Sequence, residues 1–157
     1  GGVGRRVESK GISNGVTIID DYGHHPVEIK AALKAGRMLS GNHKLIAVVQ
    51  PHRYSRLADL FADFCSCFND ADEVLVADIY AAGEAPIDGA DKASLVAGLR
   101  DHGHKAAAGL DGPDTLAAEI AARTSPGDVV MCLGAGDITT WAAALPHELD
   151  KLAGERT

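Results

Sequence analysis

Short apolar runs alternate with helix-like segments along the 157 residues of this chain. The apolar runs are rich in β-branched side chains and occupy residues 16–20, 45–50, 73–79 and 128–133. Continuous apolar runs of this kind are typical of strands that are buried on both faces, as the strands of parallel sheets are. The alternation therefore predicts an α/β domain with a mostly parallel sheet and helices on both of its faces.

Helices are expected between and after these runs. Apolar side chains recur at helical spacing in residues 26–39, 56–69, 92–101, 114–123 and 138–145. Residues 105–108 are expected to form a further short strand. Segment 5–19 predicts a hairpin with turn residues from ESKG and SNG, which makes one strand antiparallel. Because we find no internal repeat, we expect one domain over residues 1–157.

Composition and charge limit the partners of this chain. The formal net charge of −7 argues against a nucleic-acid surface, which needs a basic face. No apolar run approaches the ~20 residues of a membrane span, so no membrane contact is expected. The cysteines Cys65, Cys67 and Cys132 form no CxxC pair and are expected to be buried, reduced thiols of a soluble cytoplasmic protein. The start at Gly1 rather than Met indicates a tag remnant or a cut through a longer protein.

Polar loops follow the predicted strands at their carboxyl ends, where α/β sheets bind ligands. They read DYGHHP after residue 20, PHRYSR after residue 50, YAAGEAP after residue 79 and GAGD after residue 133. GAGDIT lacks the third glycine of a dinucleotide motif, and the chain contains no GxxxxGK[ST] phosphate loop. The first two loops are therefore the main candidates for a site.

In the first loop, Asp21, Tyr22 and His24 are the candidate functional residues. His25 precedes the helix-opening Pro26 and is expected to serve the backbone. A metal site would require further ligands at suitable spacing, and the other histidines show no such pattern, so no metal site is expected.

In the second loop, Arg53 and Arg56 are three residues apart at the start of a predicted helix, so both can face one point. Guanidinium groups grip carboxylates and phosphates through paired hydrogen bonds. The alternative is two solvated arginines on a surface helix. Their position at a carboxyl edge makes a site for a small carboxylate or a phosphate equally plausible.

Five stretches of the chain together resemble a known family. DDYGHHPVEI, VVQPHRYSR, ADIYAAGEAPIDG and LGAGDIT follow in the order found in C-terminal domains of the Mur ligase family, and GVGRRVE resembles the entry into that domain. PHRYSR is similar to the family members that join L-alanine to UDP-N-acetylmuramate. DDYGHHP alone also resembles the related ligases that attach a recycled tripeptide. Val7 departs from the family pattern, which has an aromatic residue there, and this affects packing more than chemistry.

The resemblance implies a bacterial cytoplasmic enzyme of peptidoglycan synthesis with three domains, of which this chain would be the third, a Rossmann-like three-layer domain. The first domain, for the UDP-sugar, and the central domain, with the phosphate loop and Mg²⁺, would lie outside this chain. ATP would phosphorylate the lactyl carboxylate of UDP-N-acetylmuramate, and the amine of L-alanine would attack the resulting acyl phosphate. The chain alone would not turn over.

The same resemblance implies roles for individual residues. Asp21 would accept the ribose hydroxyls of ATP, and Arg6 would pack against the adenine. The L-alanine pocket would be formed by Tyr22, His24, Arg53 and Arg56. The arginines would grip the carboxylate of L-alanine, and His24 would act catalytically by stabilising the oxyanion or by orienting the amine.

Two hypotheses of other classes stay open from the sequence. One is a stand-alone nucleotide or amino-acid binding module of the same fold. The other is a metal-dependent hydrolase that uses the histidines and acids.

Overall fold

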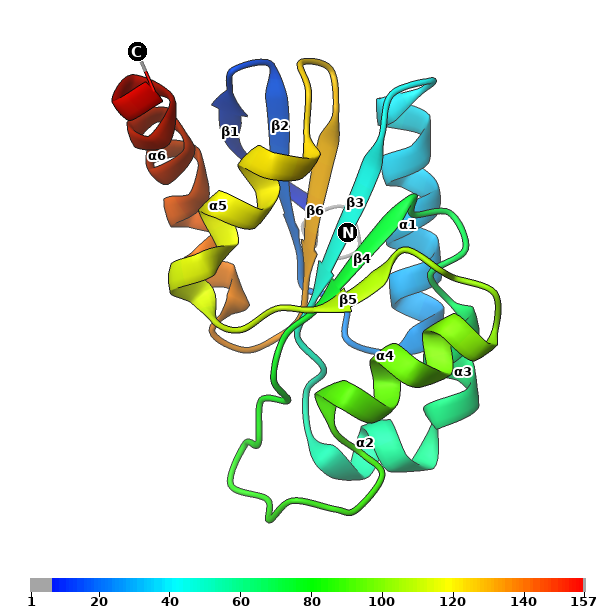
Figure 1. Ribbon diagram of the computed structural model, residues 1–157. Helices are drawn as coiled ribbons and strands as arrows, with labels where there is room; N and C mark the ends of the chain where they lie inside the picture. Colours follow the sequence, from blue (N-terminus) through cyan, green and yellow to red (C-terminus); the bar gives the residue numbers. More distant parts are fainter. Residues whose placement is uncertain (1–6, 157) are drawn as a thin grey trace.

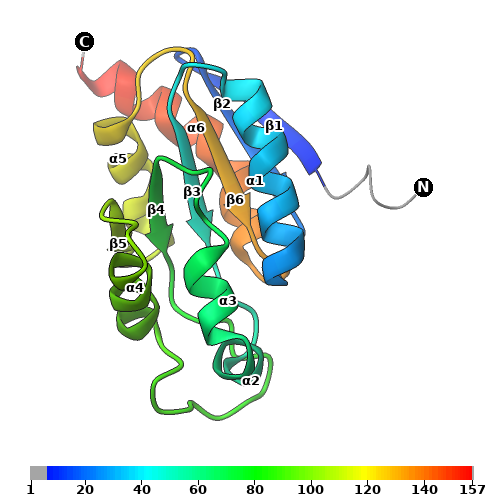
Figure 2. The ribbon, with the colours of Figure 1, turned by 90° about the vertical axis from the view of Figure 1, so that its right-hand side faces the viewer.

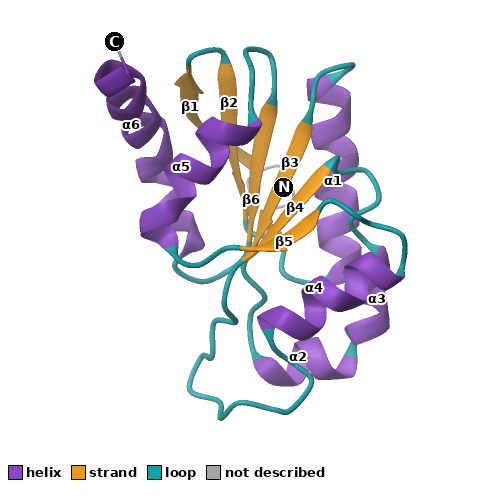
Figure 3. Ribbon diagram, in the orientation of Figure 1, coloured by secondary structure: helices purple, strands orange, loops and turns teal. Residues whose placement is uncertain are grey.

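The computed structural model describes residues 7–156, in which strands and helices alternate (Figure 1; Figure 3). The strands are β1 (Val7–Ser13), β2 (Val16–Asp21), β3 (Leu45–Val49), β4 (Glu73–Val76), β5 (Ala107–Gly109) and β6 (Val129–Leu133). The helices are α1 (Pro26–Ser40), α2 (Tyr54–Asp59), α3 (Phe61–Ser66), α4 (Lys92–Asp101), α5 (Pro113–Arg123) and α6 (Ile138–Arg156).

Within the described residues, six strands form one sheet in the order β1-β2-β6-β3-β4-β5. β1 pairs antiparallel with β2, whereas all other neighbours in the sheet are parallel. The mostly parallel sheet and the antiparallel hairpin are therefore confirmed. The carboxyl ends of β2, β3, β4 and β6 lie at one edge of the sheet, the lower edge in Figure 1.

Helices cover both faces of the sheet, which gives the predicted three layers (Figure 2). α1, α2, α3 and α4 bury Leu33, Phe64 and Leu99 in one apolar core. α5 and α6 bury Leu116 and Leu145 in the other. No helix in residues 7–156 has the length and apolar character needed to cross a bilayer.

Alternate residues of each strand feed the two cores, as the strand period of two requires. In β2, Ile18 belongs to the core under α5 and α6, and Ile19 belongs to the core under α1. The two acids that end the strand continue this alternation. Asp20 contacts Thr139 of α6, whereas Asp21 contacts Gly23 on the way to α1.

The prediction of one continuous helix over residues 56–69 is wrong. The segment forms two short helices, α2 and α3, because Leu60 leaves the helical region with φ −117° and ψ 26°. The bend lets Leu57 of α2 and Phe64 of α3 both reach the core, where neither side chain is exposed. A single straight helix is replaced by two short segments that each pack a side chain into the same core.

Three strand details also differ from the predictions. ESKG supplies no turn, because it lies within β1, where the register shifts between Ser9 and Gly11 as in a β-bulge. The short strand predicted at 105–108 begins later, as β5 at Ala107–Gly109, because the Lys105 amide donates to the carbonyl oxygen of Gly103 in a turn. The run 73–79 forms β4 only as far as Val76, and the chain then continues into the long loop that leads to α4.

Candidate functional site

The four polar loops predicted to flank the sheet converge at its carboxyl edge. The loop after β2 leads into α1, the loop after β3 leads into α2, and the long loop after β4 lies beside α2 (Figure 1; Figure 2). The loop after β6 leads into α6. Parallel pairing of β2, β6 and β3 brings these segments together although they are far apart in the sequence.

Asp21 ends β2 and organises the loop that follows. Its Oδ1 accepts a hydrogen bond from the backbone amide of Gly23 at 2.7 Å, and a Cβ on Gly23 would come within 2.8 Å of that oxygen. Glycine is therefore needed for this tight turn. Only 3% of Asp21 is exposed, so a ribose can reach its carboxylate only after the atoms that cover it move aside.

Glu28 fixes the other end of this loop against α1. Its Oε1 accepts hydrogen bonds from the backbone amides of His24 and His25, each at 3.2 Å. This is the glutamate half of a capping box, with Pro26 in the first turn of the helix. His25 is exposed at the N-cap position, which agrees with its expected backbone role.

The His24 ring is oriented by its own loop. Its Nδ1 lies 3.1 Å from the carbonyl oxygen of Tyr22 and 3.8 Å from Oε1 of Glu28. In a neutral ring, Nδ1 must carry the proton to donate to that carbonyl, which leaves Nε2 as the acceptor nitrogen. The Tyr22 ring meets the His24 ring edge-on, with centroids 5.4 Å apart.

A row of rings extends from Tyr22 across three loops. The His24 ring lies 5.6 Å from the His52 ring, and the His52 ring stacks on Tyr80 at 5.2 Å with an interplanar angle of 13°. Burial lowers the pKa of His52, and positive charge on a protonated His24, on Arg56 and on Arg53 lowers it further. His52 is therefore neutral at pH 7.

Arg56 is anchored on His52. Its Nη1 donates to the backbone oxygen of His52 at 3.0 Å and lies 3.4 Å from the Nδ1 of the ring. Because a guanidinium can only donate, Nδ1 of His52 acts as the acceptor there, which fits a neutral ring. The charges of Arg53 and Arg56 both act on His52, so both guanidinium groups lie near this imidazole.

Arg53 has an uncommon backbone conformation, with φ of 78°. Residues other than glycine enter this left-handed region at an energetic cost and do so mainly where the surrounding structure holds them. Here the Arg53 amide donates to the carbonyl oxygen of Tyr80 at 2.8 Å, and the Tyr80 amide donates to that of Pro51 at 2.8 Å. The long loop after β4 thus holds Arg53 in place, with its side chain exposed.

The loop after β6 is tied to β3 through Gln50. The Gln50 side chain donates to Asp137 and accepts from the backbone amide of Ile138 at 3.2 Å. Gly136 lies against this link, since a Cβ there would come within 2.7 Å of the Tyr80 ring and 2.8 Å of Oε1 of Gln50. GAGD therefore allows this loop to pack closely against Tyr80 and Gln50, in line with its weak match to a dinucleotide motif.

The structure brings five of the six predicted site residues to one edge: Asp21, Tyr22, His24, Arg53 and Arg56. The sixth, Arg6, lies outside the described residues. The prediction missed His52 and Tyr80, whose rings connect the first loop to the second and the second to the third. His52 stands next to Arg53 in PHRYSR, so its position was a signal, whereas only the fold brings Tyr80 to it.

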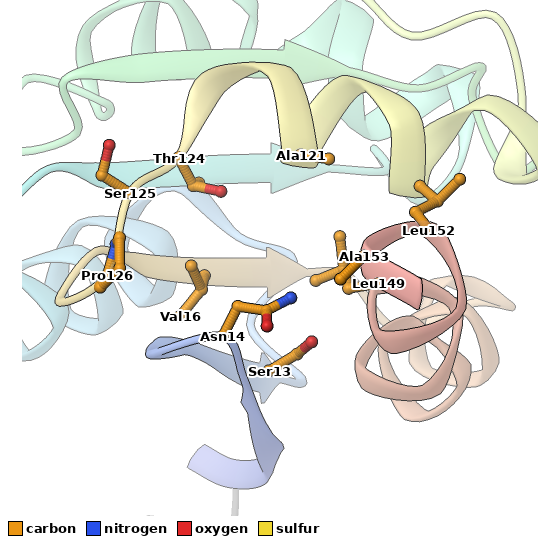
Figure 4. Close-up of a pocket in the computed structure, with 10 residues that line it drawn as sticks. All are labelled: Ser13, Asn14, Val16, Ala121, Thr124, Ser125, Pro126, Leu149, Leu152 and Ala153. Atoms are coloured by element: carbon orange, nitrogen blue, oxygen red, sulfur yellow. The ribbon is translucent and has the colours of Figure 1, made fainter. Parts of the chain in front are cut away.

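A separate cavity of about 290 Å³ lies at the opposite edge of the sheet (Figure 4). Val16, Ala121, Leu149 and Leu152 form its apolar wall, and further residues around it include the polar Asn14. None of the predicted site residues lines it. In the part of the chain that the structure describes, no three His, Cys, Asp or Glu side chains gather as a metal site would require.

Comparison with known proteins identifies relatives over nearly the whole chain. A family model described as "Mur ligase, glutamate ligase domain" matches residues 5–136. UDP-N-acetylmuramate–L-alanine ligase of Rhodospirillum centenum is 61% identical over 153 residues, which are 98% of this chain and 32% of that protein. The ligase of the same name from Methylobacterium radiotolerans is 64% identical over 149 residues, which are 95% of this chain and 32% of that protein.

The fold is also found in a solved structure. The UDP-N-acetylmuramate–alanine ligase MurC of Thermotoga maritima superposes with a TM-score of 0.67 at 24% identity, over 92% of this chain and 28% of that protein. The chain spans about a third of the length of the curated relatives it matches. The matched motifs, the sheet order and the family model together show that this chain belongs to the Mur ligase family, as its C-terminal domain.

Proposed function

We propose that this chain is the amino-acid-binding domain of a bacterial ligase that joins L-alanine to UDP-N-acetylmuramate with ATP, in peptidoglycan synthesis in the cytoplasm. The observation that carries this proposal is the grouping of Arg53 and Arg56 around His52, beside His24, at the edge where such sheets bind ligands. The high identity to ligases of that name supports the same substrate.

The two arginines would bind the carboxylate of L-alanine. A guanidinium donates paired hydrogen bonds to a carboxylate, and a neutral His52 adds no charge repulsion to the two neighbouring guanidinium groups. Arg56 is already held through the His52 carbonyl oxygen, so little side-chain freedom is lost when the substrate binds. Binding of this kind positions the amine and can supply several kcal/mol toward the reaction.

His24 would orient the amine of L-alanine. Because Nδ1 donates to the Tyr22 carbonyl oxygen, Nε2 of the neutral ring is an acceptor, which suits an N–H of the substrate better than an oxyanion. Of the two roles implied by the family resemblance, the geometry therefore favours orientation of the amine. Tyr22, in edge contact with the ring, would close one side of the pocket.

Asp21 would accept the ribose hydroxyls of ATP once its covering atoms have moved. Its fit for this role rests on a carboxylate already positioned by the Gly23 amide. As the family resemblance implies, the metal and the triphosphate would be held by a central domain beyond this chain. ATP supplies the phosphoryl group that activates the lactyl carboxylate, and no step of that transfer falls on the described residues.

The experiment is a steady-state assay of the complete ligase, which follows ADP release in the presence of UDP-N-acetylmuramate and L-alanine. We expect Arg56→Ala to raise the KM for L-alanine about 10- to 100-fold, since a charge-assisted hydrogen bond is lost, with the KM for ATP unchanged. Lys34→Ala, which removes an exposed cation from α1, serves as the control. Equal effects of the two variants on the KM for L-alanine would refute the proposed pocket, and turnover by residues 1–157 alone would refute the domain assignment.

A further inference from the structure

Residues 80–84 of the β4–α4 loop contact residues 52–55, the segment that carries Arg53 and leads to Arg56. The His52 backbone forms a parallel bridge with Tyr80, and the two rings stack. The Arg53 amide donates to Tyr80, as described above. Further along, the Glu84 side chain accepts two hydrogen bonds from Ser55, one from its backbone amide at 3.0 Å and one from its hydroxyl at 2.5 Å. In both ribbon views this loop lies beside α2 (Figure 1; Figure 2).

α2 depends on such outside support. It is only six residues long, and a helix of this length is not stable by itself in water. Its N-cap residue is Arg53, whose side chain caps none of the first amides of the helix. A carboxylate is the favoured partner for those amides, because it also complements the positive end of the helix dipole. Glu84 supplies this carboxylate from a different loop.

The loop is shaped to aim Glu84 at α2. The Glu84 amide donates to the carbonyl oxygen of Ala81 at 3.0 Å, which closes a tight turn. Both central residues of this turn have positive φ, 51° at Ala82 and 86° at Gly83. This is the pattern of a type I′ turn, which is costly at a residue other than glycine. Hydrogen bonds from Ser55 lower the pKa of Glu84, so the acceptor is a carboxylate at neutral pH.

We propose that Glu84 is a positioning residue of the amino-acid pocket: by holding Ser55, it fixes the first turn of α2 so that Arg53 and Arg56 can bind the substrate carboxylate together. Ser55 lies between the two arginines in the sequence, so a shift of its backbone moves both guanidinium groups relative to each other. Paired recognition of a carboxylate is sensitive to such a shift, since misplacement by about 1 Å can cost two orders of magnitude. The inference rests on the proposed function, because it assigns Glu84 to the same pocket.

The test compares variants of the complete ligase by steady-state kinetics with each substrate varied in turn. Glu84→Ala should raise the KM for L-alanine roughly tenfold, with kcat and the KM values for ATP and UDP-N-acetylmuramate within about twofold of wild type. Glu84→Gln keeps one acceptor oxygen and should recover part of the affinity. Asp88→Asn removes a charge from an exposed position of the same loop and should change none of these constants. Glu84 is half-exposed and stands outside both cores, so these variants should fold, which thermal unfolding of each variant verifies.

A double-mutant cycle with Ser55→Ala sharpens the result. If Glu84 acts through Ser55, the Ser55→Ala change should weaken L-alanine binding less in the Glu84→Ala background than in the wild type. Fully additive effects would refute the proposal, as would a Glu84→Ala effect on all three substrates alike. Failure of the proposed function would look different: Arg56→Ala would then leave the KM for L-alanine unchanged. A large Arg56→Ala effect together with a normal Glu84→Ala enzyme would overturn only the positioning role.

Discussion

Gly136 is the position where the smallest substitution should disturb the site most. It lies in the loop between β6 and α6, where the Tyr80 ring and the Gln50 side chain both approach the backbone. The Cβ of an alanine would lie 2.7 Å from Cγ and Cδ2 of Tyr80 and 2.8 Å from Oε1 of Gln50. Cγ is near the Tyr80 backbone, and Oε1 of Gln50 accepts from the Ile138 amide, so neither neighbour can move aside freely.

The expected loss of stability follows from this crowding. Insertion of one methyl group into a filled space usually costs about 1–3 kcal/mol in the free energy of unfolding. With a urea dependence of about 2 kcal/mol/M, this corresponds to a fall of about 0.5–1.5 M in the unfolding midpoint. Gly136→Ala should also push Tyr80 away from His52, which loosens the row of rings that reaches His24.

Urea unfolding of the 157-residue chain, followed by the fluorescence of its one tryptophan, Trp141, measures this effect. The matched control is Gly154→Ala in α6, where a Cβ would meet nothing within 4 Å. Alanine favours a helix over glycine by up to about 1 kcal/mol, so this variant should be unchanged or more stable. In a Tyr80→Ala background, Gly136→Ala should cost less. A midpoint for Gly136→Ala equal to that of the wild type would show that the loop yields without strain and would refute the reasoning.

Three further predictions concern buried ionisable groups. Burial would raise the pKa of Glu73, but hydrogen bonds from Lys44 and Arg123 outweigh it and lower the pKa. Urea unfolding at pH 7 should therefore give Glu73→Gln a free energy of unfolding about 1–2 kcal/mol below that of the wild type. This difference should disappear as the pH falls below the usual glutamate range and through the lowered pKa of Glu73. Burial raises the pKa of Asp20, so ionisation of this side chain opposes folding as the pH rises above the usual aspartate range. Asp20→Asn should therefore unfold at a higher urea concentration than the wild type at pH 7. The two proteins should unfold at the same urea concentration near pH ~3. Burial raises the pKa of Cys132 to about 12, so a thiol reagent at pH ~8 should label it no faster than the chain unfolds, and rapid labelling of the native protein would contradict its burial.

Much of the fold could be predicted because it depends on patterns within single segments. The run at β3, Leu45–Val49, is buried along its whole length, as a continuous apolar run predicts for a central parallel strand. Pro26 begins α1 for a local reason, since its fixed φ suits the first turn of a helix. The break at Leu60 could not be predicted in this way, because the helical spacing of apolar residues continues through it and tertiary packing of Leu57 and Phe64 in one core accompanies the bend.

The candidate site shows the same division between local and tertiary causes. Arg53 and Arg56 could be named because they lie three residues apart at the start of a predicted helix, just beyond the carboxyl end of a predicted strand. Tyr80 and Glu84 could not, since each acts through a residue about 30 positions away in the sequence. Single motifs therefore suggest candidate substrate contacts, whereas contacts between loops reveal which residues hold those candidates in place.

The adjacent acids Asp20 and Asp21 show why such contacts decide chemistry. The two side chains are identical and sequential, but the strand period directs them to opposite layers. Asp21 is held by the Gly23 amide beside α1, which stabilises a carboxylate as an acceptor. Asp20 is buried toward α6, where within the described residues its Oδ1 finds no partner and Thr139 alone donates to Oδ2. A ligand hydroxyl would therefore find a prepared acceptor at Asp21, whereas burial raises the pKa of Asp20. Exchange of the two environments by a one-residue shift in β2 would therefore abolish the proposed nucleotide contact.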